Sequence, residues 1–585
     1  MQPKTRMYLA LTATFAICFA SAAQAENRVV TLLYTNDIES VYEPVEAFWN
    51  PEIELIGGLP YLATLIDEVR GQAELSFLFD AGDIYTGALS QATEGRLAFD
   101  LYSLMGYDAV NLGNHEFEYG WQSLQRIRQR ARFPVLSSNL FYEDSDIAFC
   151  QAYAILEKDG FRIGVIGAMG VDAFTNAVNP AHRRGIEVRP PAPTVQRYVD
   201  AIRDEVDLVV VLTHQNRTAP MQTDKEADPE VQRGFDEDYA LAGELQGVDV
   251  IFGGHSDHGL WTPVRHPDTG TLIGLTFGQG KYLGLMKLSV DTDSGTIELI
   301  EGRLLPVESA ELEPDAEVLE RIAAARERAP QLAEVVGKID SLAFRRYYRE
   351  SNLGNLMADI LREASGADIA IMNSGSLRAD LNPGEITAEQ ILNVYPFIDS
   401  FHVVELSGSA VRELLEHSYA LHYGYAQMSG VTATYDSTLP IGKRLIAAEI
   451  SGEPLTPRKS YAVASSSFLA NGGDDYSMLA AGKLLRKSPG QMSQAFLGFF
   501  REHERIRVPP VGRQIDRVRE RPVETSGHSS PLPDPARDRP AAAGSRASAA
   551  RGGPAARGEF DGPKSAVDRG GRGCRSRGCA LRPGR

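Results

Sequence analysis

The sequence predicts an α/β protein made of two mixed units, and three observations support this fold class. Between residues 28 and 305, short apolar runs alternate with helix-like stretches, which is typical of α/β layering. Several of these runs end directly on Asp, Asn or His, the position at which ligand sites usually lie in such sheets. A charged segment rich in Ala, Glu and Arg then separates this region from residues 335–518, which have the same mixed character.

The apolar runs of the first region are each short enough to form a single buried strand. We expect strands over residues 29–34, 75–79, 109–112, 133–137, 163–167, 208–213 and 248–252. Pro314 and Asp315 open the charged segment, which predicts a solvated helix over residues 316–328 that ends before Pro330. We interpret residues 306–334, which contain this helix, as a linker between the two units.

Composition and charge restrict the classes of function. The 585 residues are 43% hydrophobic, 8% aromatic and 23% charged, which suits a globular protein of several domains and excludes a fibrous or wholly disordered chain. The formal net charge of −19 argues against binding of nucleic-acid polymers, because such binding needs basic surface. An acidic protein can still bind phosphate esters where cations are held locally, so the charge balance hints at metals.

The N-terminus predicts export. Lys4 and Arg6 precede an apolar run over residues 9–20, and an Ala-x-Ala sequence ending at Ala25 supplies the small residues of a cleavage site. The run is too short to span a bilayer comfortably, so we interpret residues 1–25 as a secretory signal peptide rather than a membrane anchor. We therefore expect a periplasmic or secreted protein with no stable membrane insertion after cleavage.

The C-terminal 519–585 segment differs in composition from the rest of the chain. It is rich in Pro, Gly, Ala, Ser and Arg and lacks apolar periodicity, so no packed core is expected. We interpret it as a disordered basic low-complexity tail, and a tail that contacts lipid or a polyanion is the alternative. Cys150 is the only cysteine between residues 28 and 518, so no disulfide is expected within that body.

Polar motifs follow five of the apolar runs of the first region. They are TNDIES (35–40), AGD (81–83), GNHE (113–116), THQN (213–216) and GGHSDH (253–258). Each is weak alone, because an Asp after a strand is usually a cap or turn residue and a lone His is usually a satisfied polar group. Together they supply carboxylate, amide and imidazole groups that suit a pair of divalent cations, with glycines that let backbone approach an ion closely.

This order of motifs (D-x-E, GD, GNHE, a strand-end His and GGH) resembles that of the calcineurin-like dinuclear metallophosphoesterases, and more narrowly that of the exported 5'-nucleotidases and UDP-sugar hydrolases. The resemblance covers residues 28–518. It implies a four-layer α/β catalytic sandwich over residues 28–305, joined by the 306–334 linker helix to an α/β substrate-binding domain over residues 335–518. It also implies a hydrolase that releases phosphate from nucleoside 5'-monophosphates, with UDP-sugars and 2',3'-cyclic nucleotides as further candidate substrates.

The resemblance assigns roles to individual residues of the first region. The implied ligands of two divalent metal ions are Asp37, Glu39, Asp83, Asn114, His214, His255 and Asp257. Asp83 would bridge the ions, His115 would be the catalytic histidine, and Glu118 would hold the His115 imidazole in place. Two cations that share a water lower its pKa, and the resulting hydroxide attacks phosphorus in line with the leaving oxygen.

Three positions depart from the commonest family pattern. Glu39 stands where His is usual, Asp257 where His or Gln is common, and Glu118 where Asp is usual. The two added carboxylates favour Mn²⁺, Mg²⁺, Ca²⁺ or iron in their site, whereas the site with two histidines suits Mn²⁺, Zn²⁺ or Co²⁺. His258 is the alternative ligand to Asp257. These departures leave two other functions open, a nucleotide-binding protein that hydrolyses poorly and a sulfur-ester hydrolase.

The second region resembles the substrate-binding half of the same family, through the motifs ESNLGNL (350–356), NSGSLR (373–378), YPF (395–397) and FLANGGDDY (468–476). The implied substrate contacts are Arg349 and Arg378 to phosphate or carboxylate, Phe397 and Phe468 to the base, and Asn373, Gly430 and Asp474 around base and ribose. Aromatic faces stack on any base, and guanidinium groups suit phosphate oxygens. For Phe397 a core position is the alternative, because a Phe after Pro in an apolar run is usually buried.

Overall fold

The computed structural model describes residues 27–47, 50, 52–216 and 234–518. The predicted signal peptide and the predicted low-complexity tail lie outside these residues, so both stay predictions. Among the described residues, no helix is both long enough and apolar enough to cross a membrane.

Two six-stranded sheets form the first region, in the orders β16-β15-β1-β4-β5-β6 and β13-β14-β12-β11-β9-β8. The first contains β1 (Asn27–Thr35), β4 (Ser76–Asp80), β5 (Ala109–Asn111), β6 (Val135–Leu136), β15 (Tyr282–Asp291) and β16 (Thr296–Pro306). The second contains β8 (Tyr153–Lys158), β9 (Phe161–Met169), β11 (Leu208–His214), β12 (Val250–Phe252), β13 (Val264–Arg265) and β14 (Leu272–Gly274). Every predicted strand is confirmed, with its limits shifted by a few residues.

The strands are apolar on both faces because each sheet packs against two layers. Along β1, Leu32 and Tyr34 face a core between the two sheets, which they share with Val210 of β11. Leu33, between them in sequence, faces a second core with the helices, as expected for side chains that alternate along a strand. A third core on the far side of the second sheet contains Val209 of β11.

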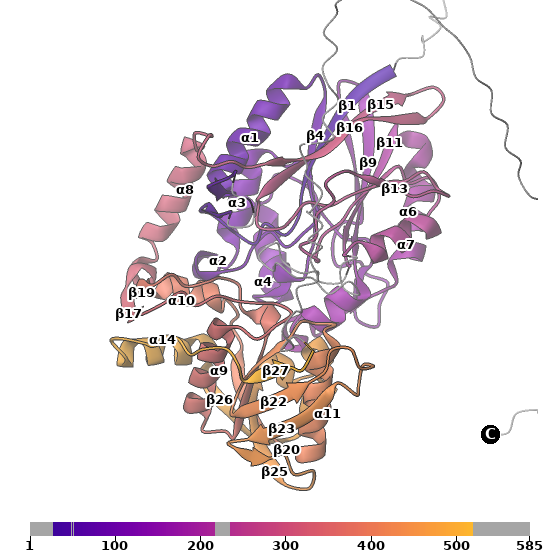
Figure 1. Cartoon of the computed structure of the whole chain (residues 1–585). Coiled ribbons are helices and arrows are strands. Elements are labelled where there is room, and N and C mark those ends of the chain that lie inside the picture. The colour runs from indigo at the N-terminus through magenta and orange to yellow at the C-terminus, as the bar shows by residue number, and fades with distance from the viewer. Residues whose placement is uncertain (1–26, 48–49, 51, 217–233, 519–585) are drawn as a thin grey trace, which may run out of the picture. The chain divides into compact units, whose positions relative to one another are not determined.

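Helices cover the outer faces of the two sheets. Helices α1 (Leu59–Gln72) and α3 (Arg96–Met105) lie on the side of the first sheet, and α6 (Pro191–Ile202) and α7 (Asp236–Glu244) lie on the side of the second (Figure 1). The predicted four-layer sandwich is therefore confirmed. Shorter elements complete this region: β2 (Val45–Glu46), β3 (Leu55–Ile56), α2 (Ala88–Thr93), η1 (His115–Phe117), α4 (Trp121–Ile127), β7 (Leu140–Tyr142), the π-helix η3 (Ala173–Ala177), α5 (Pro180–Arg183) and β10 (Ile186–Val188).

Helix α8 (Ala316–Glu327) follows the sandwich, close to the predicted limits. The Asp315 side chain caps it by accepting a hydrogen bond from the Val318 N–H at 2.8 Å. The prediction of a solvated helix is wrong for one face, because Val318, Ile322 and Ala325 are buried and α8 contacts α1 and α3. These three side chains form a narrow stripe at helical spacing. The role of this segment as a linker stays a prediction.

The second region is a mixed α/β unit, as predicted. Its five-stranded sheet contains β21 (Ala426–Ser429), β18 (Ile369–Asn373), β25 (Ser460–Ser466), β20 (Ser400–Ser407) and β26 (Lys483–Gln491), in that order. A four-stranded sheet contains β24 (Glu453–Pro454), β23 (Leu445–Ile450), β22 (Val431–Tyr435) and β27 (Gln514–Asp516). The other main elements are β17 (Val335–Ile339), α9 (Asn352–Ser365), β19 (Gly384–Thr387), α10 (Ala388–Val394), α11 (Gly408–Ala420), α12 (Ser467–Ala470), α13 (Ser477–Ala480) and α14 (Met492–Glu502).

Candidate active site

The polar motifs meet at the carboxyl ends of the parallel strands. The loop after β1 runs beside the loop after β4, because the Asp37 N–H donates to the Gly82 carbonyl and the Glu39 N–H donates to the Asp83 carbonyl, both at 3.0 Å. Several predicted ligands have positive φ: Asp37, Glu39, Asp83, His255 and Asp257. Such backbone is costly for residues other than glycine and gathers at functional sites, so these loops are shaped for ligand contact.

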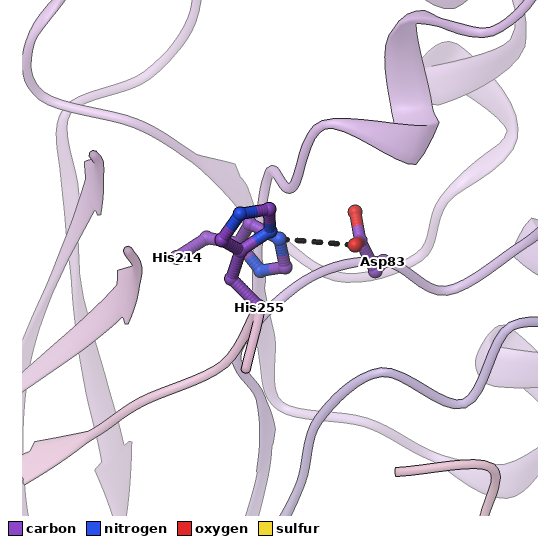
Figure 2. A group of neighbouring side chains, drawn as sticks. All are labelled: Asp83, His214 and His255. Atoms are coloured by element: carbon purple, nitrogen blue, oxygen red, sulfur yellow. Dashed lines mark ion pairs between the residues drawn. The ribbon is translucent and has the colours of Figure 1, made fainter. Parts of the chain in front are cut away.

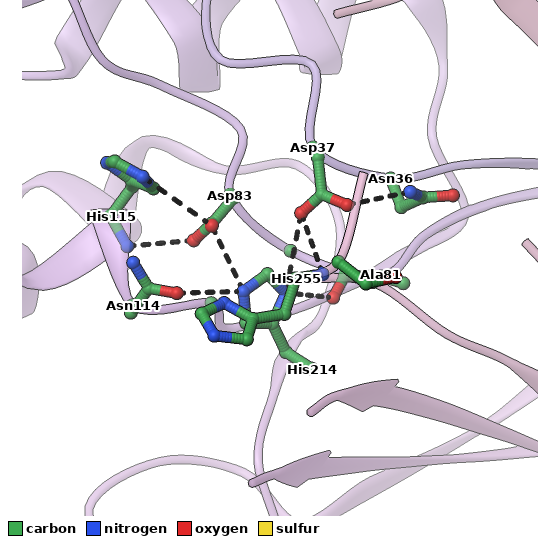
Figure 3. A network of polar contacts seen from close by, with 12 residues as sticks. Asn36, Asp37, Ala81, Asp83, Asn114, His115, His214 and His255 are labelled. Atoms are coloured by element: carbon green, nitrogen blue, oxygen red, sulfur yellow. Dashed lines mark hydrogen bonds and ion pairs between the residues drawn. The ribbon is translucent and has the colours of Figure 1, made fainter. Parts of the chain in front are cut away.

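One group of predicted ligands surrounds the His214 imidazole. Asp83, His214 and His255 each offer an atom within 4.8 Å of the others. The His214 Nε2 atom lies 3.0 Å from Asp83 Oδ2 and 3.1 Å from Asn114 Oδ1 (Figure 2, Figure 3). The other ring nitrogen, Nδ1, is 3.0 Å from the Ala81 carbonyl, an arrangement that directs Nε2 toward a metal. The structure thus brings together all the predicted ligands of this site.

The second group contains the predicted ligands Asp37, Glu39 and Asp257. Asp37 accepts a hydrogen bond from the His255 N–H at 2.9 Å and another from the Asn36 amide at 2.7 Å (Figure 3). Glu39 lies within 4.8 Å of Asp83 and His115. Asp257 lines the cavity described below, whereas His258 does not and instead packs near Phe277.

The residues of these groups fit divalent cations. Asp257 Oδ1 is buried without a hydrogen-bond partner among the described residues, which a bound cation would satisfy. Burial and the neighbouring Glu39 carboxylate raise the pKa of Asp257 to about 6, and burial raises the pKa of Asp37 as well. Carboxylates that crowd a buried site repel one another, and positive charge relieves that repulsion. Carboxylate, amide and imidazole donors are also the ligand types that these metals prefer.

Glu118 orients the His115 imidazole. Its Nδ1 atom lies 2.5 Å from Glu118 Oε1, and Thr86 donates a hydrogen bond to the same carboxylate oxygen at 2.7 Å. Burial alone would lower the pKa of His115, but the Asp83 and Glu118 carboxylates raise it to about 10. The contact with the Glu118 carboxylate places a proton on Nδ1 of the imidazole. The geometry is that of an imidazole oriented by a carboxylate, as predicted for Glu118.

Arg378 joins the second region to this site. Its Nη1 atom lies 3.0 Å from Glu39 Oε1, and its Nη2 atom lies 3.0 Å from His115 Nε2. The guanidinium is buried, and the surrounding carboxylates keep its pKa above the usual value. A fixed positive charge therefore lies beside His115.

Sequence reasoning missed Glu116, which organises the loop that carries Asp83, the predicted bridging ligand. Its carboxylate accepts hydrogen bonds from the backbone N–H groups of Asp83 at 3.0 Å, Ile84 at 2.9 Å and Gly113 at 2.5 Å. These contacts fix the two glycine-containing loops against each other. Its position inside the GNHE motif was the one signal in the sequence that could have identified it.

A cavity of about 670 Å³ connects the metal-ligand groups with the second region. Among the predicted site residues, its lining contains Asp37, Glu39, Asp83, Asn114, His115, Glu118, His255, Asp257, Asn373, Arg378, Phe397, Phe468 and Asp474. His214 lies fully buried behind this wall. One cavity therefore contains groups suited to phosphate chemistry and groups suited to base and sugar recognition.

Two predicted substrate contacts are not brought to this cavity. The Arg349 carbonyl accepts a hydrogen bond from Gln427, and Tyr347, two residues earlier, lines the cavity instead. Gly430 lies between β21 and β22 with φ of 80°, and a Cβ there would be 2.2 Å from the Asp368 carbonyl. The turn needs glycine for these backbone reasons.

The predicted aromatic pair lines the cavity. Phe397 and Phe468 are both half-buried, and the Phe397 ring centroid is 6.1 Å from that of His115. Phe397 also packs against the hydrophobic core, so the alternative of a core position is met in part, whereas the stacking role stays a prediction. Asp474 accepts a hydrogen bond from the Asn373 amide at 2.7 Å beside this pair.

The G113A variant is expected to weaken metal binding and stability. A Cβ at Gly113 would lie 2.2 Å from Asp83 Oδ1 and 2.8 Å from His214 Cε1, so both predicted ligands must move away from residue 113. We expect the free energy of unfolding to fall by about 1–3 kcal/mol and Mn²⁺ affinity to fall at least about tenfold, a change of ~1.4 kcal/mol. Thermal denaturation and calorimetric titration measure the two effects. G71A is the control, because a Cβ at Gly71 in α1 meets nothing within 4 Å. If G113A binds Mn²⁺ as tightly as the unmodified protein, the prediction is contradicted.

Two family models match the chain in succession. Residues 32–258 match the calcineurin-like phosphoesterase model, which contains all the motifs of the first region. Residues 335–481 match the model of the 5'-nucleotidase C-terminal domain.

Individual proteins with the same arrangement cover most of the chain. Protein UshA of Yersinia enterocolitica is 28% identical over 81% of this chain and 91% of that protein. The crystal structure of a 5'-nucleotidase precursor from Thermus thermophilus has a TM-score of 0.74 at 26% identity, and covers 84% of this chain and 99% of the other. The sulfate thiohydrolase SoxB of Thermus thermophilus, at 19% identity and a TM-score of 0.69 over 86% and 98% of the chains, shares the fold. With both domains matched in order, the chain belongs to the two-domain 5'-nucleotidase family of calcineurin-like phosphoesterases and is a hydrolase of phosphoric esters.

Proposed function

We propose that the protein is an exported 5'-nucleotidase that uses two divalent cations to release phosphate from nucleoside 5'-monophosphates. The observation that carries the proposal is the shared cavity, which joins the metal-ligand groups and His115 to the Phe397–Phe468 pair, with Arg378 in contact with His115. A phosphate at the metal-ligand groups and a base between the aromatic rings would occupy that cavity together. UDP-sugars and 2',3'-cyclic nucleotides are further candidate substrates of the same site.

The side chains divide the chemical work. Two bound cations would supply a nucleophilic hydroxide and neutralise the phosphate oxygens, held by the two ligand groups described above. His115, oriented by Glu118, donates a hydrogen bond or a proton as charge builds on the phosphoryl group or the leaving oxygen. Arg378 offers two N–H donors in a fork that matches phosphate oxygens.

Recognition of the nucleoside falls to the second region. Phe397 and Phe468 stack on the base, a contact worth about 1–3 kcal/mol per base in other proteins. Asp474 accepts from the ribose hydroxyls while Asn373 holds its carboxylate. Because such stacking accepts any base, we expect the protein to act on nucleotides with different bases.

The test is an assay of the purified mature protein with AMP, UDP-glucose and 2',3'-cyclic AMP. Chelation is expected to abolish phosphate release, and Mn²⁺, Mg²⁺, Co²⁺ or Zn²⁺ added singly is expected to restore it to different extents. Because of Glu39 and Asp257, we expect Mn²⁺ to restore more activity than Zn²⁺. Metal binding without hydrolysis of any of these substrates would instead support a nucleotide-binding protein.

Export is tested separately. Cell fractionation followed by N-terminal sequencing is expected to find a mature chain that begins just after residue 25 outside the cytoplasm. A cytoplasmic chain that keeps its N-terminus would refute export and leave the hydrolase activity unaffected.

A further inference from the structure

Asp399 is a buried carboxylate in the cavity wall that the roles above do not use. The residue is 7% exposed and lines the cavity together with Phe397 and Phe468. We call the part of the cavity lined by these two rings the aromatic slot. It immediately precedes the first residue of β20. Burial of a carboxylate is costly unless hydrogen bonds compensate it, so its partners indicate why it is there.

The carboxylate connects the two chain segments that form the aromatic slot. Asp399 Oδ1 accepts a hydrogen bond from the Tyr395 hydroxyl at 2.8 Å, and Tyr395 packs edge-on against Phe397 with ring centroids 5.4 Å apart. Asp399 Oδ2 accepts a longer hydrogen bond from the Phe468 backbone N–H at 3.4 Å. One side chain thus contacts both halves of the slot.

The sheet alone leaves these segments without a mutual backbone pairing. Strands β20 and β25 pair antiparallel up to Phe401 opposite Ser466, and both slot residues lie beyond that last pair. Beyond that pair, the Asp399 side chain connects the segment that precedes β20 with the segment that follows β25. Its main chain is held independently, because its carbonyl accepts a hydrogen bond from the Met492 N–H at 2.8 Å.

We propose that Asp399 is a positioning residue that sets the spacing of the aromatic slot and thereby the affinity for the nucleobase. The proposal rests on the proposed function, since it assumes a nucleoside in the slot. An asparagine at this position keeps only one acceptor oxygen. If its amide group faces the Phe468 N–H, that hydrogen bond is lost, and if it faces the Tyr395 hydroxyl, that hydroxyl must accept instead of donate. In D399N the charged acceptor is therefore gone and one of the two connections is lost or reversed, while the shape of the side chain is retained.

The experiment compares a substrate that has a base with one that lacks it. The full chain and its D399N variant are assayed with AMP and with ribose 5-phosphate. We expect the ratio of kcat/KM for AMP to kcat/KM for ribose 5-phosphate to fall about tenfold in D399N, mainly through KM for AMP, because stacking is weakened. Y395F, which removes one hydrogen bond and keeps the ring, is expected to lower the ratio about threefold and carries the test if D399N fails to fold.

D359N is the matched control. Asp359 in α9 accepts hydrogen bonds from Arg513 and Ser429, so this variant also loses side-chain contacts of the second region, but Asp359 does not line the cavity. We expect its substrate ratio to stay within about twofold of the unmodified protein. A general loss of stability would lower activity on both substrates and leave the ratio unchanged.

Calorimetric titration with adenosine separates this inference from the proposed function. We expect Kd for adenosine to rise about tenfold in D399N. If the unmodified protein hydrolyses AMP and D399N keeps both the substrate ratio and the adenosine affinity, the inference is wrong and the proposed function stands. If the unmodified protein binds adenosine, D399N weakens that binding and AMP is not hydrolysed, the inference stands and the proposed function is wrong. If the unmodified protein neither binds adenosine nor hydrolyses AMP, both are wrong.

Discussion

The D83N variant is expected to lose more activity on AMP than the roughly 10²–10⁴-fold that removal of a single acid–base residue costs. Among the described residues, Asp83 is the one that lies within 4.8 Å both of His214 and His255 and of Glu39 and His115. An amide is a weaker ligand than a carboxylate, so both cations would be held less tightly. Metal analysis of the dialysed protein should find less than half the metal content of the unmodified protein, alongside the loss of kcat.

The control for D83N is D108N. Asp108 lies in the same domain and accepts hydrogen bonds from the Leu78 N–H and from Lys158, but it does not line the cavity. We expect D108N to keep its metal content and its turnover of AMP, and to lose only some stability against unfolding. A D83N protein with full metal content and turnover within tenfold of normal would contradict the role of Asp83.

The H115N variant is expected to lower kcat by about 10²–10⁴-fold while metal content is retained. The backbone N–H of His115 donates to Asp83 Oδ1 at 2.8 Å, and this contact survives the substitution. What is lost is the imidazole that Glu118 orients through Nδ1. The rate and the metal content therefore respond differently in this variant.

A comparison of substrates with different leaving groups distinguishes two possible roles of His115. If it protonates the leaving oxygen, H115N should lose less activity on p-nitrophenyl phosphate, whose leaving group is a weak base, than on AMP. Equal losses would indicate that His115 acts on the phosphoryl oxygens instead. A loss of metal from H115N would contradict the prediction and identify His115 as a ligand, since Glu39, Asp83 and His115 also lie within 4.8 Å of one another.

The site of the first region was predictable because strand order determines it. Apolar runs identify the strands, and parallel strands place their carboxyl ends at a common edge, so polar residues directly after them converge. Asp37 and Asp83 follow β1 and β4 in this way, and His214 is the last residue of β11. The resemblance to a family then supplied the roles that these positions alone could not.

The site of the second region was less predictable, for physical reasons. Arg349 directly precedes the ESNLGNL motif and Gly430 lies outside the recognised motifs, and the sequence does not give the direction of a side chain or the demands of a turn. Glu116 and Asp399 bind backbone N–H groups of segments distant in sequence, and only the folded chain shows those partners. The buried stripe of α8 is narrow enough to be hidden by its charged neighbours.

The contacts of Arg378 mean that the two halves of the chain are not independent modules. A fragment ending at residue 305 would contain every predicted metal ligand together with His115 and Glu118. It would nevertheless lack the guanidinium that lies 3.0 Å from both Glu39 and His115. Glu39 would then lose its ion pair with Arg378 and keep only the contacts that the first region supplies, so the charges around position 39 are complete only in a polypeptide that carries both parts.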